Sequence, residues 1–325
     1  MPEPQENSTS SRPHAIYWIA SLALAGGLLY YSLRGIEWNR VWSLVKGARL
    51  ESVALALGIM TLTLFLRSMR WRILLSAERP VSIPLAFWAT STGYLGNNLL
   101  PARAGEVVRT MMVSSKSGIS KAFVLTTALS ERIVDAIVLI TISGVTLITL
   151  PEKPGWLADA ARPFAILGLS GVAAIALIPL FENFWFRCLE MLPIPHRLRD
   201  TVENILRQVL LGIRSFHDPK RLMGFVAYTA IIWFLDAETS VVISSSIGVG
   251  MSLPVAFLLI AGLGLGSALP STPGYVGIYQ FVAVSILTPF GLSKTDAIAY
   301  ILLLQALSYI CILFWGLIGF AWSRR

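Results

Sequence analysis

The sequence has few of the residues that soluble enzymes use for metal binding or nucleophilic catalysis. It contains three histidines and two cysteines among 325 residues. His14, His196 and His217 fall outside the long apolar runs, which argues against a histidine-ligated metal or a Ser-His pair within the membrane. Cys188 and Cys311 lie far apart and have no metal-ligand spacing, so neither a metal site nor a disulfide is expected.

Charged residues are also scarce in this chain. They make up 14% of the sequence against 55% hydrophobic residues, and the mean hydropathy is +0.69. These values exclude an ordinary soluble domain and predict an all-α polytopic integral membrane protein. The formal net charge of +8 comes from Lys and Arg between apolar runs, where they set topology and contact anionic lipid. Nucleic acid is therefore not expected as a partner, and no cofactor is expected.

Long apolar runs predict about six membrane-spanning helices. They are residues 15–33, 50–66, 122–150, 164–180, 222–247 and 297–322. The polar residues 1–14 are typical of a disordered tail, and Trp38 and Trp42 in the loop 34–49 favour an interfacial helix. Residues 15–325 are expected to form a single transmembrane domain.

Basic residues between the apolar runs predict how the chain is oriented in the membrane. A dense cluster, RSMRWR at 67–72, follows the second run and marks a cytoplasmic loop. The segment 182–221 carries seven basic residues and an amphipathic centre, so it is expected to lie on the cytoplasmic surface. This linker would separate repeat halves at about 50–181 and 222–323, with both termini cytoplasmic. The basic loop between the first two runs disagrees, because it falls on the predicted outer face.

A helix break with three ionisable residues interrupts the apolar sequence at residues 93–110, GYLGNNLLPARAGEVVRT. Pro101 removes a backbone donor and disfavours helical geometry at the preceding residue, and nearby glycines weaken the helix further. We expect a re-entrant helical hairpin with arms at about 83–99 and 106–115. Non-helical backbone at membrane depth is tolerated where it lines a wet cavity, so the tip, which includes Gly105, is expected to face one.

A second broken apolar segment shares the landmarks of the first. It begins with LPVAF at 253–257, against IPLAF at 83–87, and its tip reads LPSTPG at 269–274, against LPARAG. The candidate tip residues of this hairpin are Pro270, Pro273, Gly274 and Gly277. Three full spans separate the hairpins, which predicts that they enter from opposite faces as an inverted repeat. Unless the similarity is chance, such paired interrupted segments indicate the binding site of a transporter.

Ionisable residues within the predicted spans mark the interior of the bundle, because each costs roughly 2.5–3.5 kcal/mol at a helix centre. Glu131 and Asp135 are four apart on one helix and share a face, so they repel each other unless a cation lies between them. Arg132 is spaced to contact Asp135 in part. The further cations closest at hand are expected to be Arg103 and Arg109 of the first hairpin.

Two interpretations of these charges remain open at the level of sequence. In the first, they form a structural network that locks the hairpin against the long helix. In the second, at least one arginine binds an anion, because a guanidinium matches phosphate geometry. Asn97 and Asn98 either cap the helix break or contact the ligand, and of Asp236 and Glu238 only one is expected to face the cavity. The candidate substrate-binding residues are Asn97, Asn98, Arg103, Glu106, Arg109, Glu131, Arg132, Asp135 and Gln280.

In this order, RSMRWRILL, GYLGNNLLPARAGEVVRT, SERIVD and STPGYVGIYQ resemble the flippase-like transmembrane family of the lysylphosphatidylglycerol synthetase membrane domain. The resemblance implies a bacterial or archaeal cytoplasmic (inner) membrane protein that moves amphipathic lipids between leaflets. The implied site comprises the first hairpin tip, the charged face of the long helix and the second tip. Gln280 stands where many members have a glutamate, so a charge-dependent role is not implied there. The chain ends at Arg325 without an aminoacyl-transferase domain, and lysyl transfer is not expected.

Three classes of function are compatible with these features to different degrees. The main prediction is a lipid translocase for an anionic or aminoacylated phospholipid or a polyprenyl-phosphate lipid. The alternative is a non-catalytic membrane partner of a lipid-modifying or glycosyltransferase enzyme. Catalysis is not expected, because Asp135 and Asp236, the candidates for an intramembrane aspartyl pair, do not lie in a GxGD motif.

Overall fold

The structure, a computed structural model, describes residues 23–100, 104–150, 155–177, 218–267 and 273–324, with a few isolated positions between 184 and 207. Within these residues the regular structure is entirely helical, as the composition predicts. A helix at Ala23–Leu33 comes first. It is followed by α2 (Trp38–Lys46), α3 (Leu50–Leu75), α4 (Ile83–Leu99), α5 (Gly105–Ser117), α6 (Lys121–Thr149), α7 (Gly155–Leu177), α10 (Pro219–Ser246), α11 (Leu253–Gly266), η4 (Pro273–Tyr275), α12 (Ile278–Leu287), η5 (Thr288–Phe290) and α13 (Lys294–Ser323).

Four of the described helices, α3, α6, α10 and α13, are long and apolar enough to cross a membrane. They coincide with four of the six predicted spans. The run 15–33 is described only from residue 23. Helix α7 covers the expected fourth span only as far as residue 177, and it begins earlier, with Asp159, Arg162 and Pro163 in its first half. The structure therefore supports a polytopic membrane protein, and the count of six spans stays a prediction.

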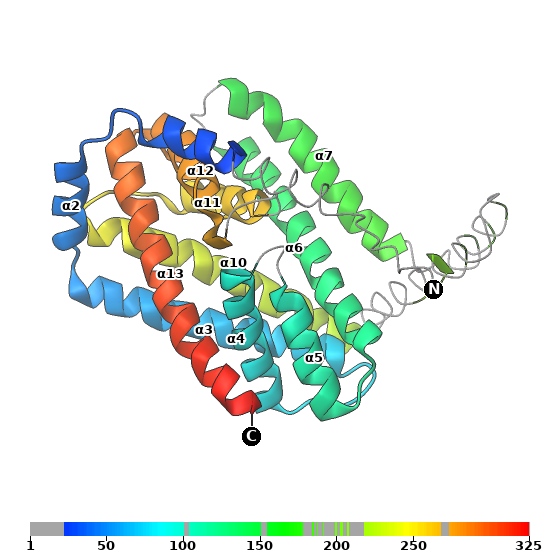
Figure 1. The fold of residues 1–325 in the computed structure, drawn as a ribbon. Helices are drawn as coiled ribbons and strands as arrows, with labels where there is room; N and C mark the ends of the chain where they lie inside the picture. The colour runs from blue at the N-terminus through cyan, green and yellow to red at the C-terminus, as the bar shows by residue number, and fades with distance from the viewer. Residues whose placement is uncertain are drawn as a thin grey trace, which may run out of the picture.

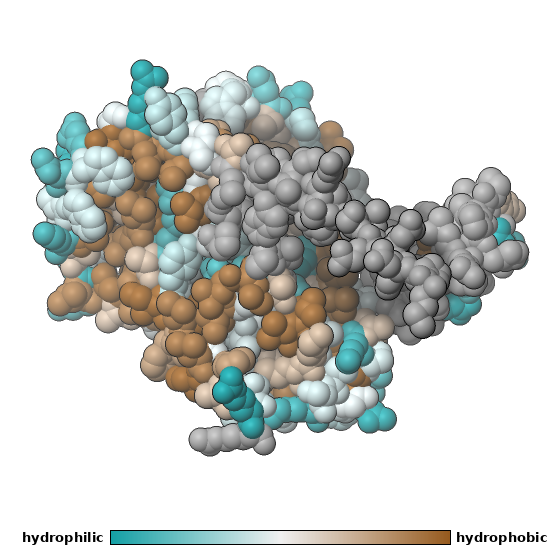
Figure 2. Space-filling model, in the orientation of Figure 1, coloured by the Kyte–Doolittle hydropathy of each residue, from teal (hydrophilic) through white to brown (hydrophobic). Residues whose placement is uncertain are grey.

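Exposed apolar side chains cover the outer surface of the long helices. On α13 they include Ile310, Leu313, Phe314 and Leu317, each of which is exposed. Figure 2 shows hydrophobic surface spread over this side of the molecule, with hydrophilic residues gathered toward its ends. An apolar surface of this extent is unusual for a soluble monomer and is suited to contact with lipid chains.

The basic cluster at 67–72 is not the cytoplasmic loop that the sequence suggested. Helix α3 continues through it to Leu75, and Arg70 is completely buried. The prediction of a loop was wrong because Arg67 and Arg70 have carboxylate partners on other helices, which offset the cost of burying the charge. A count of basic residues cannot detect partners that lie far away in the sequence. The membrane side on which the cluster lies stays a prediction.

Helical hairpins form at both predicted breaks, α4 with α5 and α11 with α12. Both hairpins begin alike, since Ser82 and Ser252 are the N-caps of α4 and α11 and a proline follows in each first turn. The arms have between 10 and 17 residues. At about 1.5 Å per residue each arm is shorter than the ~30 Å hydrocarbon core of a bilayer. Re-entry from opposite faces remains a prediction.

Each helical hairpin packs against a long helix of the other half of the chain. Helix α4 packs along α13, α11 packs along α6, and α3 packs against α10 (Figure 1). Small residues make these approaches close: a β-carbon on Gly316 of α13 would lie 2.5 Å from the β-carbon of Leu95 on α4. Likewise, a β-carbon on Gly264 of α11 would lie 2.5 Å from Cδ1 of Leu139 on α6. Each hairpin is thus held by the long helix of the other half.

The inverted topology predicts that the loops after α5 and before α11 lie on opposite sides of the membrane. We expect Gly250→Cys to react with an impermeant thiol reagent in intact cells, and Ser117→Cys to react only after lysis. Both variants are made in a background where Cys188 and Cys311 are serine. Equal labelling of the two positions from outside would contradict the inverted repeat. Labelling of neither position, even after lysis, would mean that both loops are buried in the protein.

Candidate functional site

A buried arginine on α3 separates the two carboxylates on α6. Arg70 contacts Glu131 through Nη2, 2.8 Å from Oε1, and Asp135 through Nη1, 2.7 Å from Oδ1. A second bond joins Nη2 of Arg70 to Oδ2 of Asp135 at 2.8 Å. The side chains of Arg70, Glu131 and Asp135 are 1%, 4% and 8% exposed. The cation that the spacing of these carboxylates requires is therefore Arg70, which sequence reasoning assigned to a loop.

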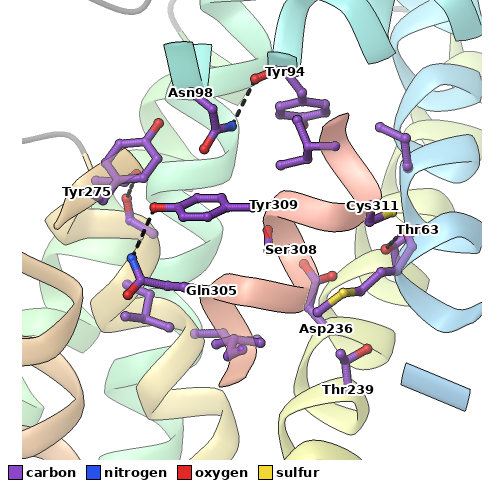
Figure 3. A pocket seen from close by; sticks show the side chains of 18 of the residues that line it. Thr63, Tyr94, Asn98, Asp236, Thr239, Tyr275, Gln305, Ser308, Tyr309 and Cys311 are labelled. Atoms are coloured by element: carbon purple, nitrogen blue, oxygen red, sulfur yellow. Dashed lines mark hydrogen bonds between the residues drawn. The ribbon is translucent and has the colours of Figure 1, made fainter. Parts of the chain in front are cut away.

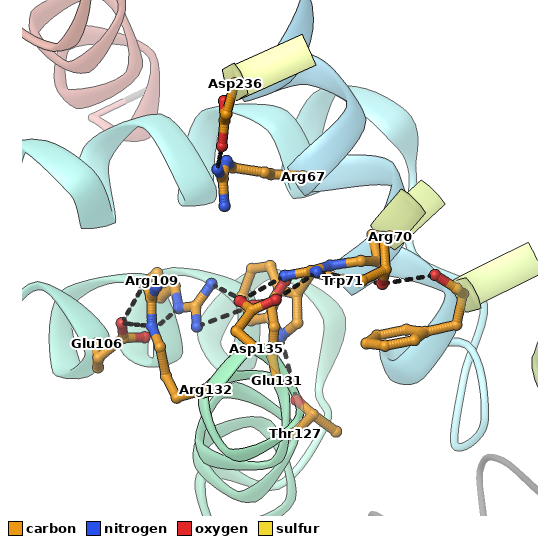
Figure 4. Close-up of polar contacts among 12 residues, drawn as sticks. Arg67, Arg70, Trp71, Glu106, Arg109, Thr127, Glu131, Arg132, Asp135 and Asp236 are labelled. Carbon is orange, nitrogen blue, oxygen red and sulfur yellow. Dashed lines mark hydrogen bonds and ion pairs between the residues drawn. The ribbon is translucent and has the colours of Figure 1, made fainter. Parts of the chain in front are cut away.

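Two further arginines tie the first hairpin to α6. Nη1 of Arg109, on α5, lies 3.2 Å from Oε2 of Glu131, and its Nε lies 2.5 Å from Oε2 of Glu106. Arg132 of α6 reaches back to α5, with Nη2 3.0 Å from Oε1 of Glu106 (Figure 4). Nδ2 of Asn97, on α4, donates to the same oxygen at 3.2 Å. The predicted contact between Arg132 and Asp135 is replaced by this pair with Glu106, because Arg70 already occupies Asp135.

A separate ion pair joins α3 to α10. Arg67 contacts Asp236 through Nη2, and its guanidinium lies 5.2 Å from the centre of the Trp233 ring. Together with the buried cluster, this pair gives four arginines and four carboxylates within the part of the chain that the structure describes. Those residues are Arg67, Arg70, Arg109, Arg132, Glu106, Glu131, Asp135 and Asp236. The described cluster is therefore charge-balanced.

A cavity of about 300 Å³ lies beside this cluster, where α3, α4, α6, α10, α11, α12 and α13 meet. Its polar wall includes Arg67, Arg132 and Asp236, together with amides and hydroxyls such as Asn98 and Ser308. Figure 3 shows Asn98, Asp236 and Ser308 around one space, on three different helices. Aliphatic side chains from α3, α11 and α13 form the remaining wall. The cavity is thus amphipathic.

The second hairpin is fixed by a hydrogen-bonded chain that starts at Gln280. Its Oε1 accepts from the backbone N–H of Gly277 at 2.7 Å, and its Nε2 donates to Oε1 of Gln305 at 2.6 Å. Nε2 of Gln305 then donates to the carbonyl of Gly274 at 3.1 Å, and the hydroxyl of Tyr309 donates to the same carbonyl. Gly274 and Gly277 have φ of 74° and 91°, so glycine is the residue that this turn accommodates.

Residues 18–316 match the family described as the Lysylphosphatidylglycerol synthase TM region. The chain belongs to this family. The resemblance in the sequence motifs is confirmed, and the apolar helices agree with an integral membrane protein. Among curated proteins, the chain is 25% identical over 293 residues to glycosyltransferase AglD of Haloferax volcanii. The match covers 80% of this chain and 46% of AglD, so the chain spans less than half the length of that relative.

In this member of the lysylphosphatidylglycerol synthase TM region family, the predicted site residues occupy three kinds of position. Those that line the cavity are Asn97, Asn98 and Arg132. Those in the ion-pair cluster beside it are Glu106, Arg109, Glu131 and Asp135. Gln280 is buried and does not line the cavity. It is hydrogen-bonded to Gln305, which does line it. Pro101, Arg103 and Pro270 lie outside the described residues, whereas Pro273 opens η4 and Gly105 opens α5.

Sequence reasoning correctly expected one acidic residue of α10 to face the cavity, and that residue is Asp236. It missed Arg67, Gln305 and Tyr309 as cavity residues and Arg70 as the centre of the buried cluster. One signal was present in the sequence. Arg67 and Arg70 are three apart, so on a continuing helix they share a face, which suits two inward-facing cations.

Proposed function

We propose that this protein is a membrane lipid translocase that moves an anionic or aminoacylated phospholipid, or a polyprenyl-phosphate lipid, between leaflets. The observation that carries the proposal is the amphipathic cavity at the junction of the two helical hairpins. Charged groups at membrane depth are costly and usually mark a substrate path or a buried pair. A cavity with two arginines in its wall meets the requirement for an anionic head group.

The size of the cavity supports binding of a head group and not of a whole lipid. About 300 Å³ lies at the lower end of small-molecule sites, so a phosphate-bearing head group fits and long chains do not. In this proposal the acyl or polyprenyl chains stay against the apolar outer surface of the long helices. Arg103, outside the described residues, stays a predicted contact for the lipid phosphate.

The paired hairpins support transport by alternating access. Interrupted helices that meet at a central site are typical of transporters built from repeats, in which one half rocks against the other. We propose a non-enzymatic role, because the two aspartates considered for catalysis are bound to different arginines, Asp135 to Arg70 and Asp236 to Arg67. The proposed location is a bacterial or archaeal cytoplasmic membrane, with both termini on the cytoplasmic side.

Filling the cavity tests this function directly. Ser308 lines it from α13, so Ser308→Phe places a ring where the head group would bind, whereas Ser308→Ala leaves the space open. Proteoliposomes with wild-type protein or Ser308→Ala are expected to exchange a fluorescent short-chain phosphatidylglycerol between leaflets. Exchange with Ser308→Phe is expected to fall to the rate of protein-free liposomes, while its elution profile in detergent matches that of the wild type.

A different result would favour the alternative, a non-catalytic membrane partner of a lipid-modifying or glycosyltransferase enzyme. That alternative draws on the similarity to the Haloferax volcanii glycosyltransferase, of which this chain spans 46%. If folded wild-type protein gives no more exchange than empty liposomes, with anionic, aminoacylated and polyprenyl-phosphate probes alike, the translocase proposal fails. Exchange by Ser308→Phe at the wild-type rate would instead exclude this cavity as the path.

A further inference from the structure

The ion pair between Arg67 and Asp236 differs from every other arginine–carboxylate contact around the cavity. Both residues line the cavity, and their side chains are 16% and 22% exposed. They come from α3 and α10, the two long helices that pack against each other between the halves. A head group that enters the cavity therefore meets this pair directly. Figure 4 shows the contact between the two side chains.

Two of the other arginines are held more firmly. Arg70 and Arg109 each contact two carboxylates, and their side chains are 1% and 3% exposed. Arg132 also faces the cavity, but its partner Glu106 is shared with Arg109 and with the amide of Asn97. If an anion drew Arg132 away, Glu106 would keep two partners. Among the described residues, Arg67 is the cavity arginine whose loss would leave a carboxylate, Asp236, without a cation.

The pair with Asp236 is joined through Nη2 of Arg67, so a phosphate that takes this nitrogen displaces the carboxylate from it. The displaced carboxylate, which is 22% exposed, would then lie beside a phosphate anion without its arginine partner, which is unfavourable. Uptake of one proton from water converts it to a neutral carboxylic acid and removes that penalty. Anion binding at Arg67 and protonation of Asp236 thus favour each other.

We propose that Arg67 and Asp236 form an exchange site, at which the phosphate of an anionic lipid binds Arg67 while Asp236 takes up a proton. The inference rests on the proposed translocase function and adds that a proton moves together with the lipid. One lipid anion and one proton occupy the site together, so the loaded site carries the same charge as the empty one. On release to the other side the carboxylic acid loses its proton and the ion pair with Arg67 forms again.

Among the carboxylates near the cavity, Asp236 is the one whose protonation can change when a phosphate binds Arg67. Glu131 and Asp135 stay bound by Arg70, and α11, which packs against α10, has no titratable side chain. The remaining charged or titratable groups around the cavity and on α10 are Arg70, Arg132, Asp135, Lys220, Arg221, Tyr228, Glu238, Tyr94, Tyr275, Tyr279, Tyr309 and Cys311. The two arginines nearest to the pair have carboxylates of their own, Arg70 with Glu131 and Asp135 and Arg132 with Glu106, so neither replaces Arg67 beside Asp236.

The test uses the full chain in liposomes that hold fluorescent short-chain phosphatidylglycerol and an entrapped pH dye. With a pH gradient, wild-type protein is expected to accumulate the lipid in the leaflet facing the alkaline side, approaching about tenfold per pH unit. Protons should enter with the lipid, and a clamped membrane potential should have no effect, because the coupled step is electroneutral. Asp236→Asn is expected to exchange the lipid without responding to the gradient and without moving protons.

Two further variants keep the test decisive. Glu238→Gln changes a carboxylate two residues away that does not line the cavity, and it is expected to keep the gradient response. The double variant Arg67→Gln with Asp236→Asn removes both charges together, so folding is retained and exchange of the anionic probe is expected to be lost.

The possible failures are distinguishable from one another. Wild-type exchange that ignores the pH gradient, or Asp236→Asn that retains the response, would overturn the exchange site and leave the translocase function standing. Wild-type exchange by the double variant would overturn the assignment of the phosphate to Arg67. An absence of exchange by folded wild-type protein would overturn the translocase function itself, and the inference with it.

Discussion

Replacing Arg70 by leucine is expected to abolish most of the folded protein. The side chain is 1% exposed and lies between Glu131 and Asp135, which are one helical turn apart. Its removal leaves two like charges facing each other in the interior, with Arg109 still in contact with only one of them. Breaking a buried pair in this way costs about 3–5 kcal/mol, a large part of a typical stability of ~5–15 kcal/mol. Thermal unfolding of detergent-purified protein, followed by size-exclusion profile, measures the loss.

Two variants control this experiment. Arg79→Leu removes an exposed arginine from the loop after α3, and it is expected to unfold at the wild-type temperature. Arg70→Leu combined with Asp135→Asn removes one of the stranded charges and is expected to recover part of the lost stability. A single Arg70→Leu protein as stable as the wild type would show that water or another cation compensates the two carboxylates.

Gly105→Val is expected to separate the two arms of the first hairpin. A β-carbon at this position would lie 1.9 Å from the carbonyl oxygen of Gly93 and 2.5 Å from the backbone nitrogen of Asn97. Both atoms belong to the backbone of α4, so no side-chain rotation relieves the clash. Since Arg109 sits one turn further along α5, the displacement would also pull its guanidinium from Glu131. We expect little folded protein in detergent and no lipid exchange from the fraction that remains.

Gly58→Ala is the matched control for that substitution. Gly58 lies within α3, and a β-carbon there has nothing within 4 Å. Alanine in a helix interior is favoured over glycine by up to about 1 kcal/mol, so this variant is expected to unfold at or slightly above the wild-type temperature. If Gly105→Val behaved in the same way, the close approach of α4 and α5 would not be needed for the fold.

Local features of the chain allowed both helical hairpins to be predicted from sequence. Pro84 and Pro254 sit in the first turn of each hairpin, and the breaks lie where proline and glycine make helical geometry costly. Those signals operate over a few residues, so a single sequence contains them in full. Four spanning helices were recoverable for the same reason, because length and apolar composition are also local properties.

The buried charges were harder to predict because their partners are distant in the sequence. Arg70 is 61 and 65 residues from its two carboxylates, and Arg67 is 169 residues from Asp236. Without the fold, RSMRWR resembles any basic segment at the end of a span, and the positive-inside rule assigns it to a loop. Gln280 was misjudged in a similar way, since its bonds to Gly277 and Gln305 depend on how α12 and α13 meet.

The packing of each hairpin against the other half of the chain has a consequence for biosynthesis. Helix α4 ends at residue 99, but the helix against which it packs, α13, begins at residue 294. Because synthesis proceeds from the N-terminus, the first hairpin leaves the ribosome long before its docking surface exists. The face of α4 that receives α13, which includes Ser91 and Leu95, must therefore be kept from other contacts, by lipid or by the insertion machinery, until α13 arrives. Contacts of such long sequence separation form slowly, so the late docking of α13 onto α4 is expected to limit the rate at which the membrane-inserted chain reaches its final fold.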